Sequence, residues 1–264
     1  MALERTDILA ALTHLLSPRT DVLAAWEAGS AAFSRADAWS DIDLSIIAED
    51  GAVPDVAAVI LEELRSLSPI EMQWVLPSPT WHGHYQAFYK LRDTNPFLLL
   101  DIVIMERSAT GRFMETALHG TPHVAFDKEG LIRPEHLDHD AHMAKILARL
   151  DHLRSTVPLM RSLALKELER GRPIDAMAFY HSHTLRPLVE LLRIRYSPAR
   201  YNFGARYLHH DLPAEAAQRV ERLFFVPDPA SLRAAHREAW EWFAELAAAI
   251  DPEAVAARLR EQDG

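Results

Sequence analysis

The sequence predicts an α/β fold of the α+β type, in which a mixed β-sheet domain is followed by an all-α helical domain. In the first half, short segments with the period-two alternation of half-buried strands are separated by turns and by segments with helical periodicity. After residue 133 the pattern changes to amphipathic helices punctuated by proline. We therefore expect a sheet domain at residues 1–133 and a helical domain at residues 134–264.

The first half reads as alternating helices and strands. The expected elements are a helix at 3–16, strands at 22–26 and 41–47, a helix at 53–67, strands at 70–76, 86–91 and 97–105, and a strand with its turn at 123–130. Between the first two strands, Gly29-Ser30 predicts a tight turn, with a short helix opening at Ala31.

The second half reads as helices only. We expect them at 138–156, 157–171, 173–196, 213–225 and 230–260, with several prolines at helix starts. Pro187 lies inside a helical pattern and predicts a kink or a division there.

Composition excludes several classes of protein. With 264 residues, 49% hydrophobic and 25% charged, the chain is typical of a globular protein with an ample core. The absence of cysteine excludes disulfides, thiolate metal sites and a cysteine nucleophile.

The charge and the N-terminal pattern indicate partners and location. A formal net charge of -10 disfavours a nucleic-acid backbone as the main partner and favours a cationic small molecule. The N-terminal helix carries Glu4 and Asp7 and does not resemble a signal peptide, and no apolar run is long enough to span a bilayer. We expect a cytoplasmic protein that does not bind membranes; its oligomeric state has no signature in the sequence.

The most informative residues are two aspartates at the start of the second strand. Asp41 and Asp43 alternate with Ile42, Leu44 and Ile46, so both carboxylates should point from the same face. Two adjacent carboxylates repel each other unless a positive charge lies between them. A divalent cation such as Mg²⁺ or Mn²⁺ suits this donor set, since Mg²⁺ uses one or two carboxylates together with water and substrate phosphates.

Gly29-Ser30, followed by ten residues and Asp41-Ile42-Asp43, resembles the signature of the nucleotidyltransferase superfamily. The helical half after residue 133 is similar in layout to the antibiotic (aminoglycoside-type) nucleotidyltransferases, in which a helical domain faces the catalytic sheet. The resemblance implies that Gly29 and Ser30 bind the β- and γ-phosphates of a nucleoside triphosphate and that Asp41 and Asp43 bind the metal. A surface hairpin rich in serine and aspartate is the alternative interpretation of the motif.

Asp101 is the candidate for the third carboxylate that the resembled family places on a neighbouring strand. It lies within the continuous apolar run 97–105, where an unpaired carboxylate would be costly, so it needs a cation or a hydrogen-bond partner. It would complete the metal site or accept the proton of the attacking hydroxyl. A buried structural aspartate is the alternative, and Glu71 is a weaker rival for the same role.

A third group of candidates lies in the segment 197–212, where Arg200 and Arg206 accompany two tyrosines in an otherwise acidic chain. These arginines could bind the triphosphate, or they could pair with local carboxylates. Three close histidine pairs, beginning at His82, His181 and His209, lack a recognised metal-binding spacing.

The sequence thus indicates an enzyme that transfers a nucleoside monophosphate, most simply AMP from ATP, to a hydroxyl of a small acceptor such as an aminoglycoside. Two alternatives stay open: a nucleotidyltransferase that modifies a protein or RNA, as in toxin–antitoxin pairs, and a catalytically silent nucleotide-binding regulator.

Overall fold

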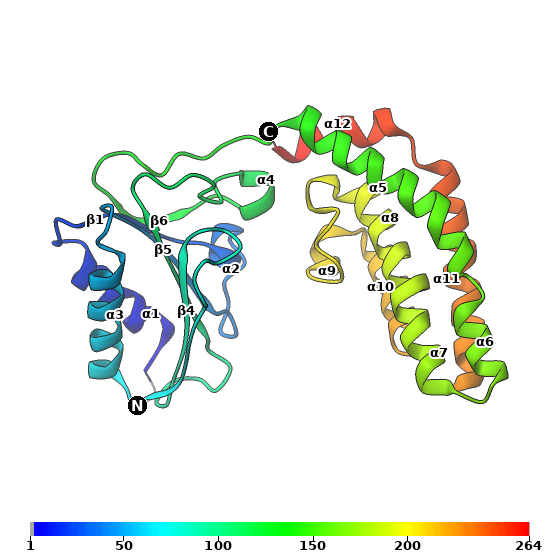
Figure 1. Ribbon diagram of the computed structural model, residues 1–264, viewed down its shortest axis with the longest axis horizontal. Helices are drawn as coiled ribbons and strands as arrows, with labels where there is room; N and C mark the ends of the chain where they lie inside the picture. Colours follow the sequence, from blue (N-terminus) through cyan, green and yellow to red (C-terminus); the bar gives the residue numbers. More distant parts are fainter. Residues whose placement is uncertain (1–2, 264) are drawn as a thin grey trace. The chain divides into compact units, whose positions relative to one another are not determined.

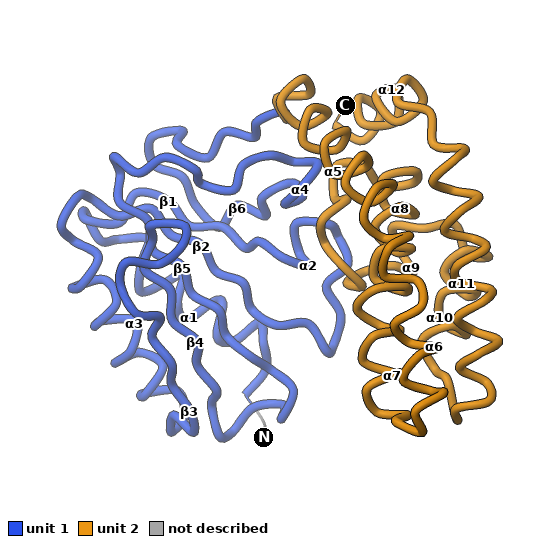
Figure 2. Tube along the Cα trace, turned by 45° about the vertical axis from the view of Figure 1, so that its right-hand side comes forward, with its two compact units in different colours: residues 1–136 blue, residues 137–264 orange. Residues whose placement is uncertain are grey.

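The computed structural model describes residues 3–263, which divide into two compact units, residues 1–136 and 137–264 (Figure 2). The division falls close to the predicted boundary at residue 133. The first unit contains a mixed six-stranded sheet with helices and the second contains helices, so the predicted α+β fold class is confirmed.

The first unit follows the predicted succession of elements, with the short helix α4 in addition (Figure 1). These are α1 (Arg5–Leu16), β1 (Val22–Glu27), α2 (Gly29–Ala32), β2 (Ile42–Ala48), α3 (Val53–Leu67), β3 (Ile70–Val75), β4 (Tyr85–Leu91), β5 (Leu100–Glu106), α4 (Thr116–His119) and β6 (His123–Asp127).

The sheet has the strand order β3-β4-β5-β2-β1-β6, and β2 and β5 pair in parallel while the other neighbours are antiparallel. The helices α1 and α3 cover one face, which we call the helix face (Figure 1). There, apolar side chains of both helices pack on alternate residues of the central strands; these include Ile8, Leu12, Val56, Ile60, Ile42, Leu44, Ile46, Leu100, Ile102 and Ile104.

The opposite face, which we call the open face, is covered by other segments over only part of its area. A smaller apolar cluster forms where Met114, Leu131 and Ile132 pack on strand residues such as Trp26 and Met105. The strict alternation of β2 and β5 therefore places Asp43 and Asp101 on the open face, while their apolar neighbours enter the core between the sheet and the helices.

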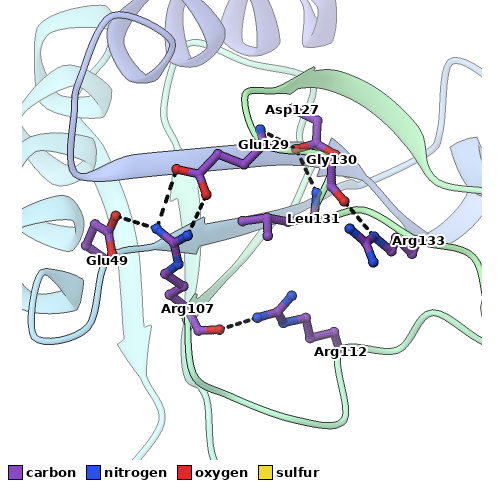
Figure 3. Close-up of polar contacts among 8 residues, drawn as sticks. All are labelled: Glu49, Arg107, Arg112, Asp127, Glu129, Gly130, Leu131 and Arg133. Carbon is purple, nitrogen blue, oxygen red and sulfur yellow. Dashed lines mark hydrogen bonds and ion pairs between the residues drawn. The ribbon is translucent and has the colours of Figure 1, made fainter.

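Ion pairs join the carboxyl ends of the central strands. Arg107, directly after β5, donates to Glu49 at 2.9 Å and to Glu129 at 2.6 Å, and Figure 3 shows its guanidinium between the two carboxylates. Asp127 accepts hydrogen bonds from the backbone N–H groups of the turn that follows, including that of Leu131 at 3.0 Å (Figure 3). These contacts hold together the end of the sheet at which β2 and β5 finish. Asp41, just before β2, lies at the other end.

The second unit consists of α5 (His139–Met160), α6 (Leu163–Glu169), α7 (Pro173–Tyr180), a π-helical turn (His181–Leu185), α8 (Arg186–Tyr196), a 3₁₀ turn (Pro198–Arg200), α9 (Leu208–Asp211), α10 (Ala214–Phe224), α11 (Pro229–Ala249) and α12 (Pro252–Asp263). Its core is a single cluster to which α5, α7, α8, α10 and α11 contribute buried side chains. Among the described residues, no helix is both long and apolar enough to cross a bilayer.

Three predicted boundaries were wrong. The break expected at 156–157 does not occur, because Pro158 lies in the last turn of α5, where buried Leu153 and Val157 keep the helix packed. The helix expected at 230–260 is two helices, which divide before Pro252. The strand expected from Phe97 begins at Leu100, because residues 95–98 form a turn in which the Leu98 N–H donates to the Asn95 carbonyl.

Near Pro187 a division was expected, and a π-helical turn immediately precedes α8 there. A proline lacks the N–H that an α-helix requires, and a wider turn is one way to accommodate it.

Candidate active site

The start of α2 packs directly against the Asp43 side chain, because this helical turn begins at Gly29 and not, as expected, at Ala31. Gly29 adopts a φ of +55°, and a Cβ atom at this position would lie 1.7 Å from the Asp43 Oδ2 and 2.6 Å from its Cγ. The preceding Ala28 N–H donates to the Asp43 carbonyl at 2.8 Å. Only glycine allows this conformation and this approach together, so the Gly29-Ser30 turn and the β2 carboxylate form one structural feature.

Asp43 and Asp101 are partners in the parallel register of β2 and β5. Partners on adjacent strands point from the same face with backbones about 5 Å apart. Asp41 joins them from the residue before β2, where its Oδ1 accepts the Leu99 N–H at 3.0 Å. Asp43 and Asp101 are thus neighbours at the amino ends of two central strands, and a metal site formed by these two with Asp41 stays a prediction.

A hydrogen-bonded chain supports Asp101. The Gln86 side-chain amide donates to both carboxylate oxygens, at 2.8 and 2.9 Å, and its Oε1 lies 3.0 Å from the His82 Nε2. The His82 Nδ1 accepts the His84 N–H at 3.1 Å, which assigns the ring proton to Nε2 and makes His82 a donor to Gln86. Both residues hold Asp101 in place, and the sequence analysis had noted His82 only as a histidine without metal-binding spacing.

The environment raises the pKa of Asp101 above its ordinary value. Burial is the main cause, and the Asp41 charge acts in the same direction, whereas the Gln86 hydrogen bond and His82 oppose them. A carboxyl group with a raised pKa accepts a proton more readily than an exposed aspartate, which suits a general base.

Arg5, on the first turn of α1, supplies a positive charge beside the carboxylates. Its Nε donates to the Asp41 carbonyl at 3.3 Å, and its guanidinium forms an ion pair with Glu27, a buried residue at the end of β1. Burial lowers the pKa of Arg5, and the Asp43 charge opposes this effect. No sequence signal indicated Arg5, because its contacts depend on how α1 packs on the sheet.

The carboxylates fit a divalent cation in their chemistry. Asp41, Asp43 and Asp101 offer hard oxygen donors beside a turn that approaches Asp43 closely. Within residues 3–263, no group of three or more histidine, aspartate and glutamate side chains is already arranged around one point as a metal site. Mg²⁺ needs only one or two protein carboxylates, since substrate phosphates and water complete its shell.

The remaining carboxylate and turn candidates have distinct positions. Ser30 lies in α2, where its carbonyl accepts the Arg35 N–H at 2.9 Å, and its contact with a phosphate stays a prediction. Glu71 lies on the edge strand β3, which β4 separates from β5. Asp101, and not Glu71, is therefore the carboxylate beside Asp43.

Arg200 and Arg206 belong to the second unit. Arg200 forms an ion pair with Asp211, whose other oxygen accepts from the buried Arg193 at 2.8 Å. Arg206 is exposed and donates to the Tyr207 hydroxyl at 3.1 Å. Arg200 thus has a structural role of the kind considered as the alternative, and nucleotide binding by either arginine stays a prediction.

Comparison of the sequence with family models and with curated proteins finds no match. Comparison with solved structures finds an aminoglycoside 6-adenyltransferase from Bacillus subtilis at 12% identity and a TM-score of 0.33, over 98% of this chain and 96% of that chain. A similarity this low supports no conclusion about activity, so the site is interpreted from its own residues.

Proposed function

We propose that this protein is a metal-dependent nucleotidyltransferase that transfers AMP from ATP to a hydroxyl group of a small-molecule acceptor. The observation that carries the proposal is the register of Asp43 with Asp101 next to Gly29, whose backbone packs against the Asp43 carboxylate. A carboxylate pair beside a glycine turn provides sites for a cation and for phosphates within one strand spacing.

Asp41 and Asp43 would hold Mg²⁺ or Mn²⁺, with Asp101 as a third ligand or as the base. When bound, the cation would neutralise the triphosphate and make the α-phosphorus more electrophilic. The backbone N–H groups of Gly29 and Ser30 would hold the β- and γ-phosphates.

In the transfer, the acceptor oxygen forms a bond to the α-phosphorus while the bond from that phosphorus to the bridging oxygen of the β-phosphate breaks. Pyrophosphate leaves with that bond's electron pair, and the acceptor hydroxyl proton moves to the Asp101 carboxylate. Gln86 and His82 keep Asp101 oriented for this step. Catalysis then depends on positioning and on charge neutralisation.

At long range, the net charge of -10 favours a polycationic acceptor such as an aminoglycoside, whose binding would weaken as salt screens the field. Transfer to a protein or RNA, and binding of nucleotide without transfer, are the competing functions.

The test is to incubate the protein with ATP, Mg²⁺ and a panel of aminoglycosides, lincosamides and neutral glycosides. Pyrophosphate release would be measured together with the mass of each acceptor, which should increase by one adenylyl group. Asp43→Asn should abolish transfer while leaving the fold intact, because it removes a charge and preserves shape. Asp55→Asn is the matched control, since Asp55 is exposed on α3, on the helix face.

Three outcomes separate the possible functions. Transfer that Asp43→Asn abolishes and Asp55→Asn preserves supports the proposal. ATP binding without transfer to any acceptor would indicate a regulator, and transfer at the wild-type rate by Asp43→Asn would refute the proposed site.

A further inference from the structure

The row of side chains that contains Asp43 and Asp101 continues onto an exposed aromatic surface. Phe88 on β4 is the register partner of Asp101, and Trp74 on β3 is the partner of Phe88. The two rings stack, with centroids 5.6 Å apart and planes 21° from parallel. Trp74, Phe88, Asp101 and Asp43 therefore cross four strands in order on the open face.

Next to this row, Met72 and Lys90 form another cross-strand pair on the same face. We call Met72, Trp74, Phe88 and Lys90 the aromatic platform. Trp74 is 61% exposed and Met72 is 67% exposed. By contrast, Ala87 and Tyr89, which flank Phe88 on β4 and point to the helix face, are buried. An apolar surface left open on a folded unit usually marks a binding site.

Lys90 supplies a positive charge to the platform. Within residues 3–263 it forms no ion pair, although Glu71 lies beside Met72 at the bulge of β3. Asp101 is in register with Phe88, so the row of rings leads directly to that carboxylate. The platform thus has a lysine within it and the Asp101 carboxylate next to it in the row.

We propose that the aromatic platform binds the acceptor. On this inference, which rests on the proposed function but replaces the polycationic acceptor that the net charge favours, the acceptor is a hydroxylated molecule with a flat ring and no positive charge at the end near Lys90. With strands about 4.8 Å apart, a molecule whose hydroxyl lies at Asp101 and whose ring covers Phe88 and Trp74 extends about 10 Å across the sheet. Aromatic glycosides have this length and shape.

Size and continuity favour a small molecule over a protein partner. The platform consists of four side chains on two strands and joins the carboxylate row without interruption. A stable protein interface needs about 800 Å² on each partner, which is more than four side chains present.

The experiment uses the full chain and three probes: a nitrophenyl glucoside, which is neutral; a nitrophenyl glucuronide, which is anionic; and kanamycin, which is polycationic. Calorimetry measures the binding of each probe and, separately, of ATP with Mg²⁺. The variants are Trp74→Ala and Lys90→Glu, with Phe225→Ala as the control, because Phe225 is an aromatic residue of the second unit that is 78% exposed.

We expect Trp74→Ala to weaken binding of both nitrophenyl glycosides about tenfold, since a stacked ring contributes of that order. Phe225→Ala should have no effect on them. Lys90→Glu should weaken glucuronide binding and strengthen kanamycin binding, and every variant should bind ATP as the wild type does.

Kanamycin binding that exceeds glycoside binding in the wild type and survives Trp74→Ala would overturn the inference. A dimer in sedimentation that Trp74→Ala dissociates would also overturn it, because a second copy would then cover the platform. If the wild type binds the nitrophenyl glycosides but no ATP, and Trp74→Ala loses glycoside binding, the proposed function is refuted and the platform remains a binding site.

Discussion

Replacing Gly29 with alanine tests the packing of the turn against Asp43. The positive φ of +55° costs an alanine roughly 1 kcal/mol or slightly more. In addition, the new Cβ would lie 1.7 Å from the Asp43 Oδ2. The carboxylate would have to retreat by about 2 Å to restore an ordinary non-bonded contact.

The displacement should affect activity more than stability. Overpacking of this kind costs about 1–3 kcal/mol of unfolding free energy. A catalytic group misplaced by about 1 Å can cost about 100-fold in rate, so nucleotidyl transfer should fall at least that far. Urea denaturation measures the first effect, and pyrophosphate release measures the second.

Gly51→Ala is the matched control. Gly51 has a φ of +82°, and no atom lies within 4 Å of the position its Cβ would take. This variant should lose about 1 kcal/mol from the backbone alone and keep its activity. Adding Asp43→Ala to Gly29→Ala should recover stability, because it removes the atom that collides. The reasoning would be refuted if Gly29→Ala lost no more stability and no more activity than Gly51→Ala. It would also be refuted if the stability changes of Gly29→Ala and Asp43→Ala simply added in the double variant.

Three further predictions follow from particular contacts. Burial raises the pKa of Asp101 in the folded protein, so its ionised carboxylate destabilises the fold at pH values above the unfolded-state pKa of about 3.9. Asp101→Asn should therefore be more stable than wild type at pH 7 without metal. Urea midpoints should converge as the pH falls towards about 4, and a difference independent of pH would contradict this. ATP should bind more tightly with Mg²⁺ or Mn²⁺ and lose affinity in excess chelator, because phosphates and carboxylates repel; equal calorimetric affinities would argue against a metal. Arg193→Met should lower the unfolding free energy by about 3 kcal/mol or more, because it removes a fully buried partner of Asp211. The exposed Arg206→Met is its control and should stay within about 0.5 kcal/mol of wild type, so equal losses would refute a structural role for Arg193.

Local pattern was sufficient for the strands and for the face that carries the carboxylates. Alternation of Asp41 and Asp43 with isoleucine and leucine predicted β2, and the polar residue inside the apolar run predicted that Asp101 needs a partner. The identity of that partner, Gln86, depends on the register of β4 with β5. Register is set by tertiary packing, which the sequence alone does not display.

Arg5 was missed, and a helix break near Pro158 was wrongly predicted, for related reasons. Arg5 reaches Asp41 across 36 positions of the chain through the packing of α1 on the sheet. At Pro158 the local rule predicted a helix end, but buried side chains before it favour continuation of α5 to Met160. In both cases a long-range contact outweighs the local preference.

The parallel pairing of β2 with β5 has a consequence for the order of folding. The hairpins β1–β2 and β3–β4 close between neighbouring strands, whereas β2 meets β5 only after the intervening chain has turned back, across the 58 positions that separate Asp41 from Leu99. Long-range pairings of this kind form late and slowly. Asp43 and Asp101 therefore meet, and begin to repel each other, in the step that completes the centre of the sheet. A cation that binds both carboxylates would lower the barrier to that step as well as stabilise the finished site, so assembly of this unit should proceed faster when the metal is present.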